Sequence, residues 1–368
     1  MASALFSSVF GDLVKNIQIR FDQVSALQKQ WFDQVLFEKY LSWDAMTSVK
    51  LDFEEIIGKY NITIAAPTIG NNSKESIVGN NGVETLREKL VNHAITIPLT
   101  MEDYRKVLEI RSTNLLTPQQ QKDQLINLMF GNVTDAVNGV RAKLDLIFLS
   151  ALSNEGKFEF NADTNPEGIR GSIDYNQPAA NIATATTPWT EANKDTVDPL
   201  EDILAMCDAA QDKVVLAKIL LSPAKLNYIL RAKKTRQMMW GTDKAMRMVN
   251  LQDYNAYLQQ NGLPILEPVR RQIRVQDNGI IKTITPFNGK NIVAIPDGSL
   301  GVVKNAFANN ELSPEPTVGY ANYGRIRVSQ WSVGEAQGSN KVEYTKAECY
   351  ALPVITEMQG IYTLKTES

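Results

Sequence analysis

The chain has 368 residues, of which 43% are hydrophobic and 21% charged, and its formal net charge at pH 7 is −3. This composition is typical of a folded protein with two or three domains, and the sequence has no basic tail for tight nucleic-acid binding and no apolar run long enough to span a bilayer. We expect no signal peptide, because Met1 to Gly11 lacks a positive region and Gly11-Asp12 interrupts any hydrophobic run. Cys207 and Cys349, the only cysteines, stand among apolar residues and are predicted to be reduced, buried thiols of an intracellular chain.

Residues 12–45 are predicted to form one or two helices, because apolar side chains recur there three or four positions apart. Aromatic side chains outside this stripe add further apolar surface: Phe32, Phe37, Tyr40 and Trp43. Either this region docks on the core of its own subunit, or it is an arm laid across a neighbouring subunit. In the second case Trp31 and Phe32 are interface residues.

Residues 58–105 are predicted to form a long β-arm. Apolar and polar residues alternate at 62–64 and again at 95–99, and Gly79-Asn80-Asn81-Gly82 marks a turn between these limbs. An isolated ribbon is marginal in water, so the arm needs a polar partner surface, such as another subunit; the alternative is a solvated hairpin. The candidate interface residues on it are Lys74, Glu75, Glu84, Arg87, Glu88, Lys89 and His93.

The segment from Pro118 to Asn154 is predicted to be one helix, about 55 Å long at 1.5 Å per residue. Thr117 and Pro118 form a helix-start signal, Gln120 completes a capping box, and Gly156 follows the end. Such a helix is about three times the usual length, so we expect a spine under an extended, flattened molecule.

After a strand at 157–161, residues 162–198 form a long irregular connection, which is the expected border between two lobes. The second lobe is predicted to mix α and β structure. Helices begin at Pro199, with Asp198 as the cap, and after Ser222; a strand covers 214–221. Strands separated by Gly-containing turns follow over 265–304. The C-terminal strands are expected to return to the first lobe, near the long helix.

Catalytic and metal-binding signals are scarce. His93 is the only histidine and lies on the predicted arm, where a base would be poorly held, so we expect a solvated or interface histidine. One histidine and two distant cysteines cannot form a zinc site, and no phosphate-binding loop or calcium loop occurs. We therefore predict no enzymatic activity, no catalytic or metal-ligating residue and no cofactor.

A basic cluster stands out in the second lobe: Arg231, Lys233, Lys234 and Arg236. A solvated helix face is its ordinary interpretation. The functional alternatives are weak, sequence-independent contact with DNA phosphates and salt bridges at an assembly axis. A second basic group comprises Arg270, Arg271 and Arg274.

The order of parts resembles the major capsid proteins of tailed phages with the Hong Kong 97-type fold, in particular the phage lambda E-type branch. The long helix with Asp123 to Gly156 looks like the spine helix of that family. Ile173-Asp174-Tyr175, Trp189 and Asp198-Pro199-Leu200-Glu201-Asp202 look like the start of its axial (A) domain. Later segments with the same likeness are Ile219-Leu220-Leu221-Ser222, Ile295-Pro296-Asp297-Gly298 and Glu343 to Ile355. The likeness covers most of residues 50–365.

The resemblance implies an α+β, Hong Kong 97-like capsid fold. Its expected domains are an N-terminal arm at 1–57, an extended β-arm (E-loop) at 58–105, a peripheral domain at 106–197 with spine helix 118–154, an axial domain at 198–325, and a return to the peripheral domain at 326–368. The resemblance implies pentamers and hexamers in an icosahedral shell around double-stranded DNA. The expected location is the virion, after assembly in the host bacterial cytoplasm.

The partners implied by the resemblance are copies of the same chain, scaffold, portal and decoration proteins, and packaged DNA through weak contacts, with no membrane. Two other functions stay open from the sequence. An encapsulin-like shell around a cargo enzyme keeps the same fold, and a carboxylate-dependent hydrolase belongs to another class.

Overall fold

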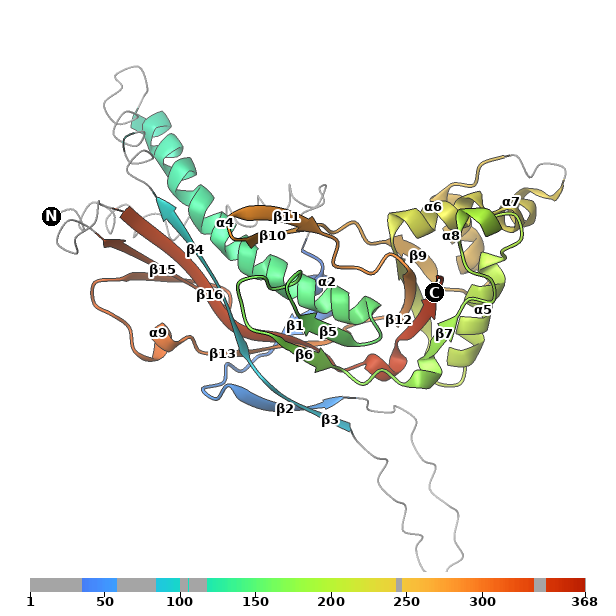
Figure 1. Ribbon diagram of the computed structural model, residues 1–368, viewed down its shortest axis with the longest axis horizontal. Helices are drawn as coiled ribbons and strands as arrows, with labels where there is room; N and C mark the ends of the chain where they lie inside the picture. The colour runs from blue at the N-terminus through green and yellow to red at the C-terminus, as the bar shows by residue number, and fades with distance from the viewer. Residues whose placement is uncertain are drawn as a thin grey trace, which may run out of the picture.

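The computed structural model describes residues 35–57, 84–99, 105, 118–242, 247–333 and 342–367. The predicted spine is present as one helix, α4 (Pro118–Ser153), which runs the length of the first lobe (Figure 1). It ends where Glu155 and Gly156 adopt positive φ angles of 58° and 78°, and the Gly156 amide bonds the Ala151 carbonyl at 2.9 Å. This left-handed turn satisfies a free carbonyl at the helix end.

A six-stranded sheet lies against α4. Its main path is β1 (Leu41–Trp43), β13 (Gly301–Ala306), β16 (Val342–Ile355), β15 (Ile326–Val333) and β14 (Gly319–Tyr323); β4 (Val91–Leu99) also pairs with β16. β1 and β13 are parallel, and the other pairs are antiparallel. Ile95 of β4 packs at Gly139 of α4, where a Cβ would lie 3.2 Å from its Cδ1. The short helix α2 (Phe37–Tyr40) comes directly before β1. The short helix α9 (Asn309–Leu312) lies between β13 and β14.

The second lobe contains a five-stranded sheet in the order β7 (Ile182–Thr184), β17 (Tyr362–Lys365), β12 (Asn291–Pro296), β8 (Leu216–Leu221) and β9 (Ile265–Pro268). Four helices belong to this lobe: α5 (Pro199–Ala210), α6 (Pro223–Arg231), α7 (Lys233–Trp240) and α8 (Leu251–Gln260). The side chains of Asp198, Ser222 and Asn250 accept a backbone N–H three residues on, which caps α5, α6 and α8. The predicted starts of α5 and α6 are confirmed.

The inner strand β12 of the five-stranded sheet is buried on both faces. On β12, Ile292 and Ala294 belong to the core of the second lobe, whereas Val293 and Ile295 belong to the large core that contains α4. Successive side chains of a strand point to opposite faces, so this one strand contributes to both cores. The two lobes therefore share a sheet rather than meeting at a solvated border.

The remaining strands of the described chain form three two-stranded ribbons. β2 (Asp52–Ile57) pairs with β3 (Glu84–Lys89), β5 (Lys157–Phe160) with β6 (Gly171–Asp174), and β10 (Ile273–Asp277) with β11 (Ile280–Ile284). The last ribbon turns at Asn278 and Gly279, both with positive φ as a two-residue hairpin requires. Single 3₁₀ turns occupy Ala179–Asn181, Glu191–Asn193 and Met358–Gly360.

The sheets divide the chain differently from the expected domains. β4, within the expected arm at 58–105, is a strand of the central sheet, and the base of the ribbon begins earlier, at Asp52. β13 and β14, within the expected axial domain at 198–325, also belong to that sheet, and β17 of the expected peripheral return joins the second-lobe sheet. Alternation shows which faces of a strand are buried, but it does not identify the partner strand.

Candidate subunit interface

The β2–β3 ribbon carries charged pairs on its outward face. Glu54 lies opposite Arg87, with 2.9 Å between carboxylate and guanidinium, and Asp52 lies opposite Lys89 at 3.7 Å. All four side chains are at least half exposed, so these pairs add little to the stability of the subunit. Arg87 and Lys89 of this face are among the predicted interface residues, whereas Asp52 and Glu54 precede the arm expected at 58–105.

The inward face of the same ribbon is anchored. Leu86 is buried and Phe53 packs against the large core. Lys304 of β13 binds the Glu55 carboxylate at 2.5 Å and the Asp44 carboxylate at 2.8 Å. The ribbon therefore lies at the edge of the body (Figure 1), with its base fixed and its outer face exposed.

The predicted interface residues differ in their exposure to solvent. Arg87 and Lys89 are exposed, and Glu88 is half-buried on the inward face. Glu84 is described only as part of the backbone of β3, and Trp31, Phe32, Lys74 and Glu75 lie outside the described residues.

The prediction for His93 is wrong. The residue lies on β4 of the central sheet, is buried, and its Nε2 is 3.1 Å from the Ala351 carbonyl, to which it donates as the neutral tautomer. Burial, with the nearby Lys143 ammonium, lowers the pKa of His93 to about 4. The error follows from assigning residues 91–99 to the arm.

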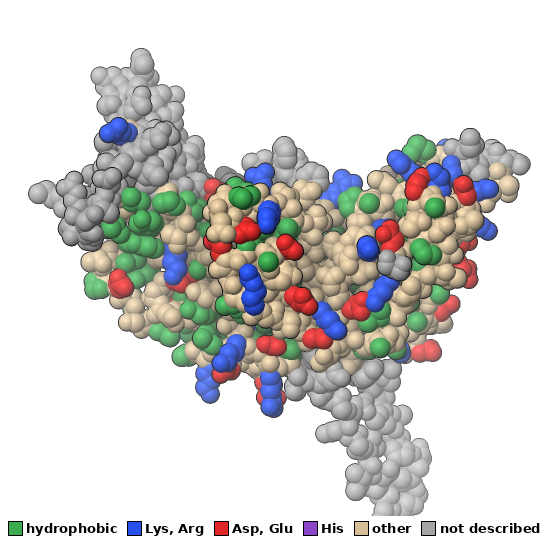
Figure 2. All heavy atoms as spheres, viewed as in Figure 1, with side chains coloured by type: hydrophobic (Ala, Val, Ile, Leu, Met, Phe, Trp, Pro, Cys, Tyr) green, Lys and Arg blue, Asp and Glu red, His purple; other side chains and the backbone are tan. Residues whose placement is uncertain are grey.

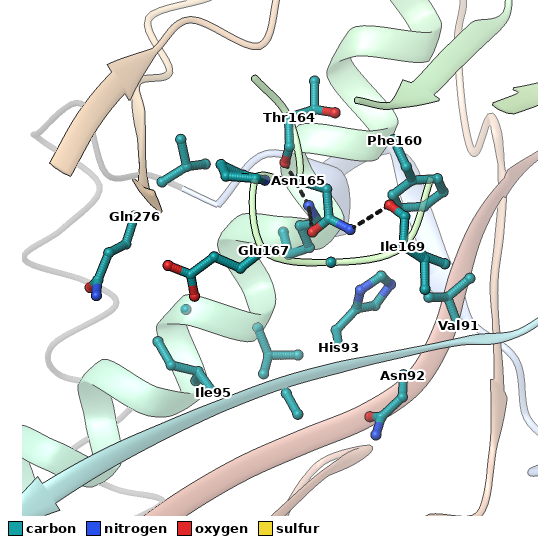
Figure 3. A pocket seen from close by; sticks show the side chains of 17 residues that line it. Val91, Asn92, His93, Ile95, Phe160, Thr164, Asn165, Glu167, Ile169 and Gln276 are labelled. Atoms are coloured by element: carbon teal, nitrogen blue, oxygen red, sulfur yellow. Dashed lines mark hydrogen bonds between the residues drawn. The ribbon is translucent and has the colours of Figure 1, made fainter. Parts of the chain in front are cut away.

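A pocket of about 550 Å³ opens between β4, α4 and the loop after β5 (Figure 3). Lys143 of α4 donates to the Thr164 carbonyl at 2.7 Å and to Asn165 Oδ1 at 3.1 Å. Burial lowers the pKa of Lys143 to about 8. His93 and Lys143 are thus occupied by internal bonds, and the pocket has no nucleophile bonded to a base.

A buried carboxylate fixes the beginning of the described chain. Asp145 of α4 accepts the Leu36 amide at 2.9 Å and the Phe37 amide at 2.7 Å, and it forms an ion pair with the buried Arg271 at 2.8 Å. Burial raises the pKa of Asp145 to about 6, although the Arg271 charge and the two amides favour its ionised form. We name this group the Asp145 clasp.

Two further contacts reinforce the Asp145 clasp. Glu38 lies 3.6 Å from Arg141, and Glu267 of β9 binds both the Lys39 ammonium and the Tyr40 hydroxyl. Sequence reasoning missed the clasp, although Asp145 was a visible signal as a lone carboxylate within the apolar run of the spine helix. Arg271, assigned to a surface basic group by the sequence, is buried here.

An ordered segment between β1 and β2 exposes apolar side chains. Its backbone bonds β13 from Asp44 and Ser48, and Arg325 donates to the Asp44 and Ala45 carbonyls. Met46 is nevertheless 82% exposed and Val49 66%. These side chains therefore lie in solvent on a backbone that hydrogen bonds hold in place.

The basic cluster is at the outer end of the second lobe. Arg231, Lys233 and Lys234 are exposed at the end of α6 and the start of α7, and Arg236 is half-buried. Figure 2 shows Lys and Arg side chains gathered over this end of the molecule. Both cysteines are free thiols: Cys349 is buried as expected, whereas Cys207 is only half-buried, and burial raises the pKa of each.

The described residues contain no cluster of three or more His, Cys, Asp or Glu side chains arranged to hold a metal ion. Among the helices of the described chain, none combines the length and apolar character needed to cross a membrane.

Comparison with known proteins gives consistent results. A family model described as phage major capsid protein E matches residues 28–366. A crystal structure of a protein assigned as the capsid protein of a prophage of Escherichia coli CFT073 aligns with 15% identity and a TM-score of 0.55, covering 94% of this chain and 98% of that chain. A phage-related protein from Bordetella bronchiseptica RB50 aligns with 11% identity and a TM-score of 0.48, covering 90% and 91%. No curated protein matches the chain.

Proposed function

The chain belongs to the phage major capsid protein E family, and from this premise we propose that its copies form the pentamers and hexamers of an icosahedral shell around double-stranded DNA. The chain is a capsid shell protein with the Hong Kong 97-like α+β fold expected from the sequence. Its family is one of structural proteins. Its place is the capsid of the virion, and we propose that assembly takes place in the host cytoplasm.

The proposed contact between copies rests mainly on the β2–β3 ribbon. Its base is locked by Lys304 and Leu86, while its outer face carries two exposed ion pairs that contribute little within the subunit. We propose that this ribbon begins the arm by which one copy contacts the next, with Arg87 and Lys89 at the contact. A contact between different patches of successive copies closes into rings when its rotation allows.

The second lobe is proposed to face the capsomer axis, and the first lobe, with α4 and the six-stranded sheet, to contact neighbouring capsomers. Scaffold, portal and decoration proteins are proposed as further partners, and packaged DNA as a weak, non-specific one. The exposed Met46 and Val49 segment is a surface available for such contacts.

The test replaces residues 60–81 by a short Gly-Ser linker. Because β2 and β3 keep their pairing and their buried side chains, the subunit should retain its wild-type circular dichroism and melting temperature. Electron microscopy should show shells for the wild type and none for the variant. Normal shells from the variant would refute the proposed role of the arm.

The contents of native particles provide a second measurement. Nuclease-protected DNA is expected inside. Particles that hold an enzyme and no DNA would instead assign the protein to a cargo compartment, and a wild type that remains monomeric under all assembly conditions would refute the shell.

A further inference from the structure

The second lobe has two charged helix faces of opposite sign. On α5, Glu201 and Asp208 are exposed and seven positions apart, which places them on one side of the helix, and Asp212 is exposed in the turn that follows. We call this the acidic face. Arg231, Lys233 and Lys234, at the junction of α6 and α7, form the basic face.

These two faces lie on different sides of the lobe. In Figure 2, Lys and Arg gather at the upper right end, over α6–α8, whereas Asp and Glu follow the right edge, along α5. Val215, which is 85% exposed, lies three residues after Asp212 and adds an apolar contact near the acidic face, with the exposed Lys213 between them. Two different patches of opposite charge are what a head-to-tail contact between identical copies requires.

The charges of the two faces are not neutralised by ion pairs within the described chain. The nearby ion pairs of the lobe join Lys194 to Glu191 and Lys225 to Glu367, and they include no member of either face. On the β2–β3 ribbon, by contrast, each exposed charge has an opposite charge directly across the strand pair. Arg231, after Lys194, helps to lower the pKa of the Glu191 carboxyl, so its charge is partly used within the subunit. Lys233, Lys234, Asp208 and Asp212 belong to no ion pair of the described chain, and their charges remain for an external partner.

Some of these charges oppose the local preference of their helices, whereas Glu201 in the first turn of α5 and Arg231 in the last turn of α6 agree with it. α7 begins with Lys233 and Lys234, after an Ala232 that provides no side-chain cap, although a helix N-terminus favours negative charge. α5 has no basic residue in its last turn, and Asp208 and Asp212 stand at the end that favours positive charge. Charges placed against the helix dipole weaken the isolated subunit, and such exceptions mark functional positions.

We propose that the basic face of one copy binds the acidic face of the next copy around the capsomer ring. The proposal rests on the shell function and identifies the second copy as the partner of the basic cluster. The start of α7 carries a positive dipole end and two ammonium groups. It would meet the end of α5, which carries a negative dipole end and two carboxylates, with Val215 at the contact.

The test uses charge reversal in the full chain. Variant A carries Lys233→Glu and Lys234→Glu, variant B carries Asp208→Lys and Asp212→Lys, and variant AB carries all four changes. Lys290→Glu, an exposed reversal in the turn before β12, is the matched control. Circular dichroism and thermal unfolding of the monomers establish that each variant folds, and native mass spectrometry with sedimentation measures ring formation.

Variants A and B should each lower the association constant between copies by about tenfold or more, because like charges then face each other. Variant AB should recover ring formation, and the control should match the wild type. Mixing A with B should give rings with even numbers of subunits only, because A and B must alternate.

Three results would overturn the proposal: ring formation by A or B equal to that of the wild type, failure of a folded AB to recover, or odd-numbered rings from the mixture. Rings from A that have lost only DNA retention would assign the basic face to nucleic acid instead. These results leave the shell function intact, whereas absence of any assembly by the wild type would refute the shell function itself.

Discussion

At the scale of single residues, Asp145 is a buried charge that joins three distant parts of the chain. Its carboxylate is fully buried and joins α4, the N-terminal segment at Leu36 and the loop that carries Arg271. A buried charge is tolerated only with hydrogen bonds and an opposite charge, and Asp145 has both. Loss of either partner leaves the other charge unsatisfied.

Replacing Asp145 by Ala should therefore lower the free energy of unfolding by about 3–5 kcal/mol, because the Arg271 guanidinium loses its carboxylate in the interior. Urea denaturation of the unassembled subunit measures the change. Glu38→Gln is the control, since the Glu38–Arg141 pair is partly exposed and is worth about 0–1 kcal/mol. Equal effects of the two substitutions would contradict the role assigned to Asp145.

His93 makes stability depend on pH. Its pKa is about 4 in the folded chain and 6.5 as a model value, so the unfolded chain binds the proton first as pH falls. The contribution of the neutral side chain is complete above pH 6.5 and is lost between pH 6.5 and pH 4, an effect of about 3 kcal/mol at 1.36 kcal/mol per pKa unit.

His93→Gln keeps a donor for the Ala351 carbonyl and removes the titration. Asp145 acts with the opposite sign in the same interval, because its raised pKa favours the folded chain as pH falls. The difference between wild-type and His93→Gln unfolding free energies cancels that term. It should shrink as pH falls from 6.5 to 4, and a constant difference would show that His93 does not titrate as stated.

At the scale of elements, the junction of β1, β13 and β16 depends on Gly301. A Cβ at this position would lie 2.0 Å from the Val354 carbonyl oxygen and 2.8 Å from the Thr356 nitrogen, both of them backbone atoms that cannot rotate away. The pairing of Leu41 with Gly301, and of Gly301 with Ile355, requires this close approach.

Gly301→Ala should lower the free energy of unfolding by about 3 kcal/mol or more, because the strands must separate to accept the methyl group. Gly319→Ala is a matched control. It is also the first residue of a strand in the same sheet, and its Cβ would meet only the Gln330 carbonyl at 3.8 Å. Chemical denaturation measures the free energy of unfolding of both variants. Equal values would contradict the close approach at Gly301.

Local elements follow closely from the sequence because their signals are local. The long apolar periodicity and Pro118 predict α4 to within a residue, and Asp198 and Ser222 cap the helices expected after them. Asn278-Gly279 turns as its dipeptide indicates. Each of these outcomes depends on residues within a few positions of one another.

At the scale of the whole molecule, pairings between distant segments could not be predicted. β4 pairs with β16 some 250 residues later in the sequence, and alternation at Ile95 and Ile97 is equally consistent with an arm or with a sheet. Because of that ambiguity, His93 was expected on the arm, whereas it lies in the core. The Asp145 clasp was hidden for the same reason, since its partners lie more than 100 residues away on either side.

The resemblance to capsid proteins predicted the family and the fold, but not which surfaces join the copies. The sequence does not show which charged side chains pair within the subunit, because pairing depends on where they lie in space. The acidic and basic faces of the second lobe are an example. The outward placement of Arg87 and Lys89 matches the expectation from the sequence, and their contact with a neighbour stays a prediction.

The sheet that both cores share has a mechanical consequence. Tilting one lobe against the other would strip Val293 and Ile295, or Ile292 and Ala294, of their packing and hydrate a wide apolar area. Each subunit should thus behave as a single stiff tile. A change in the curvature of a shell built from such tiles would then have to be taken up at the contacts between subunits.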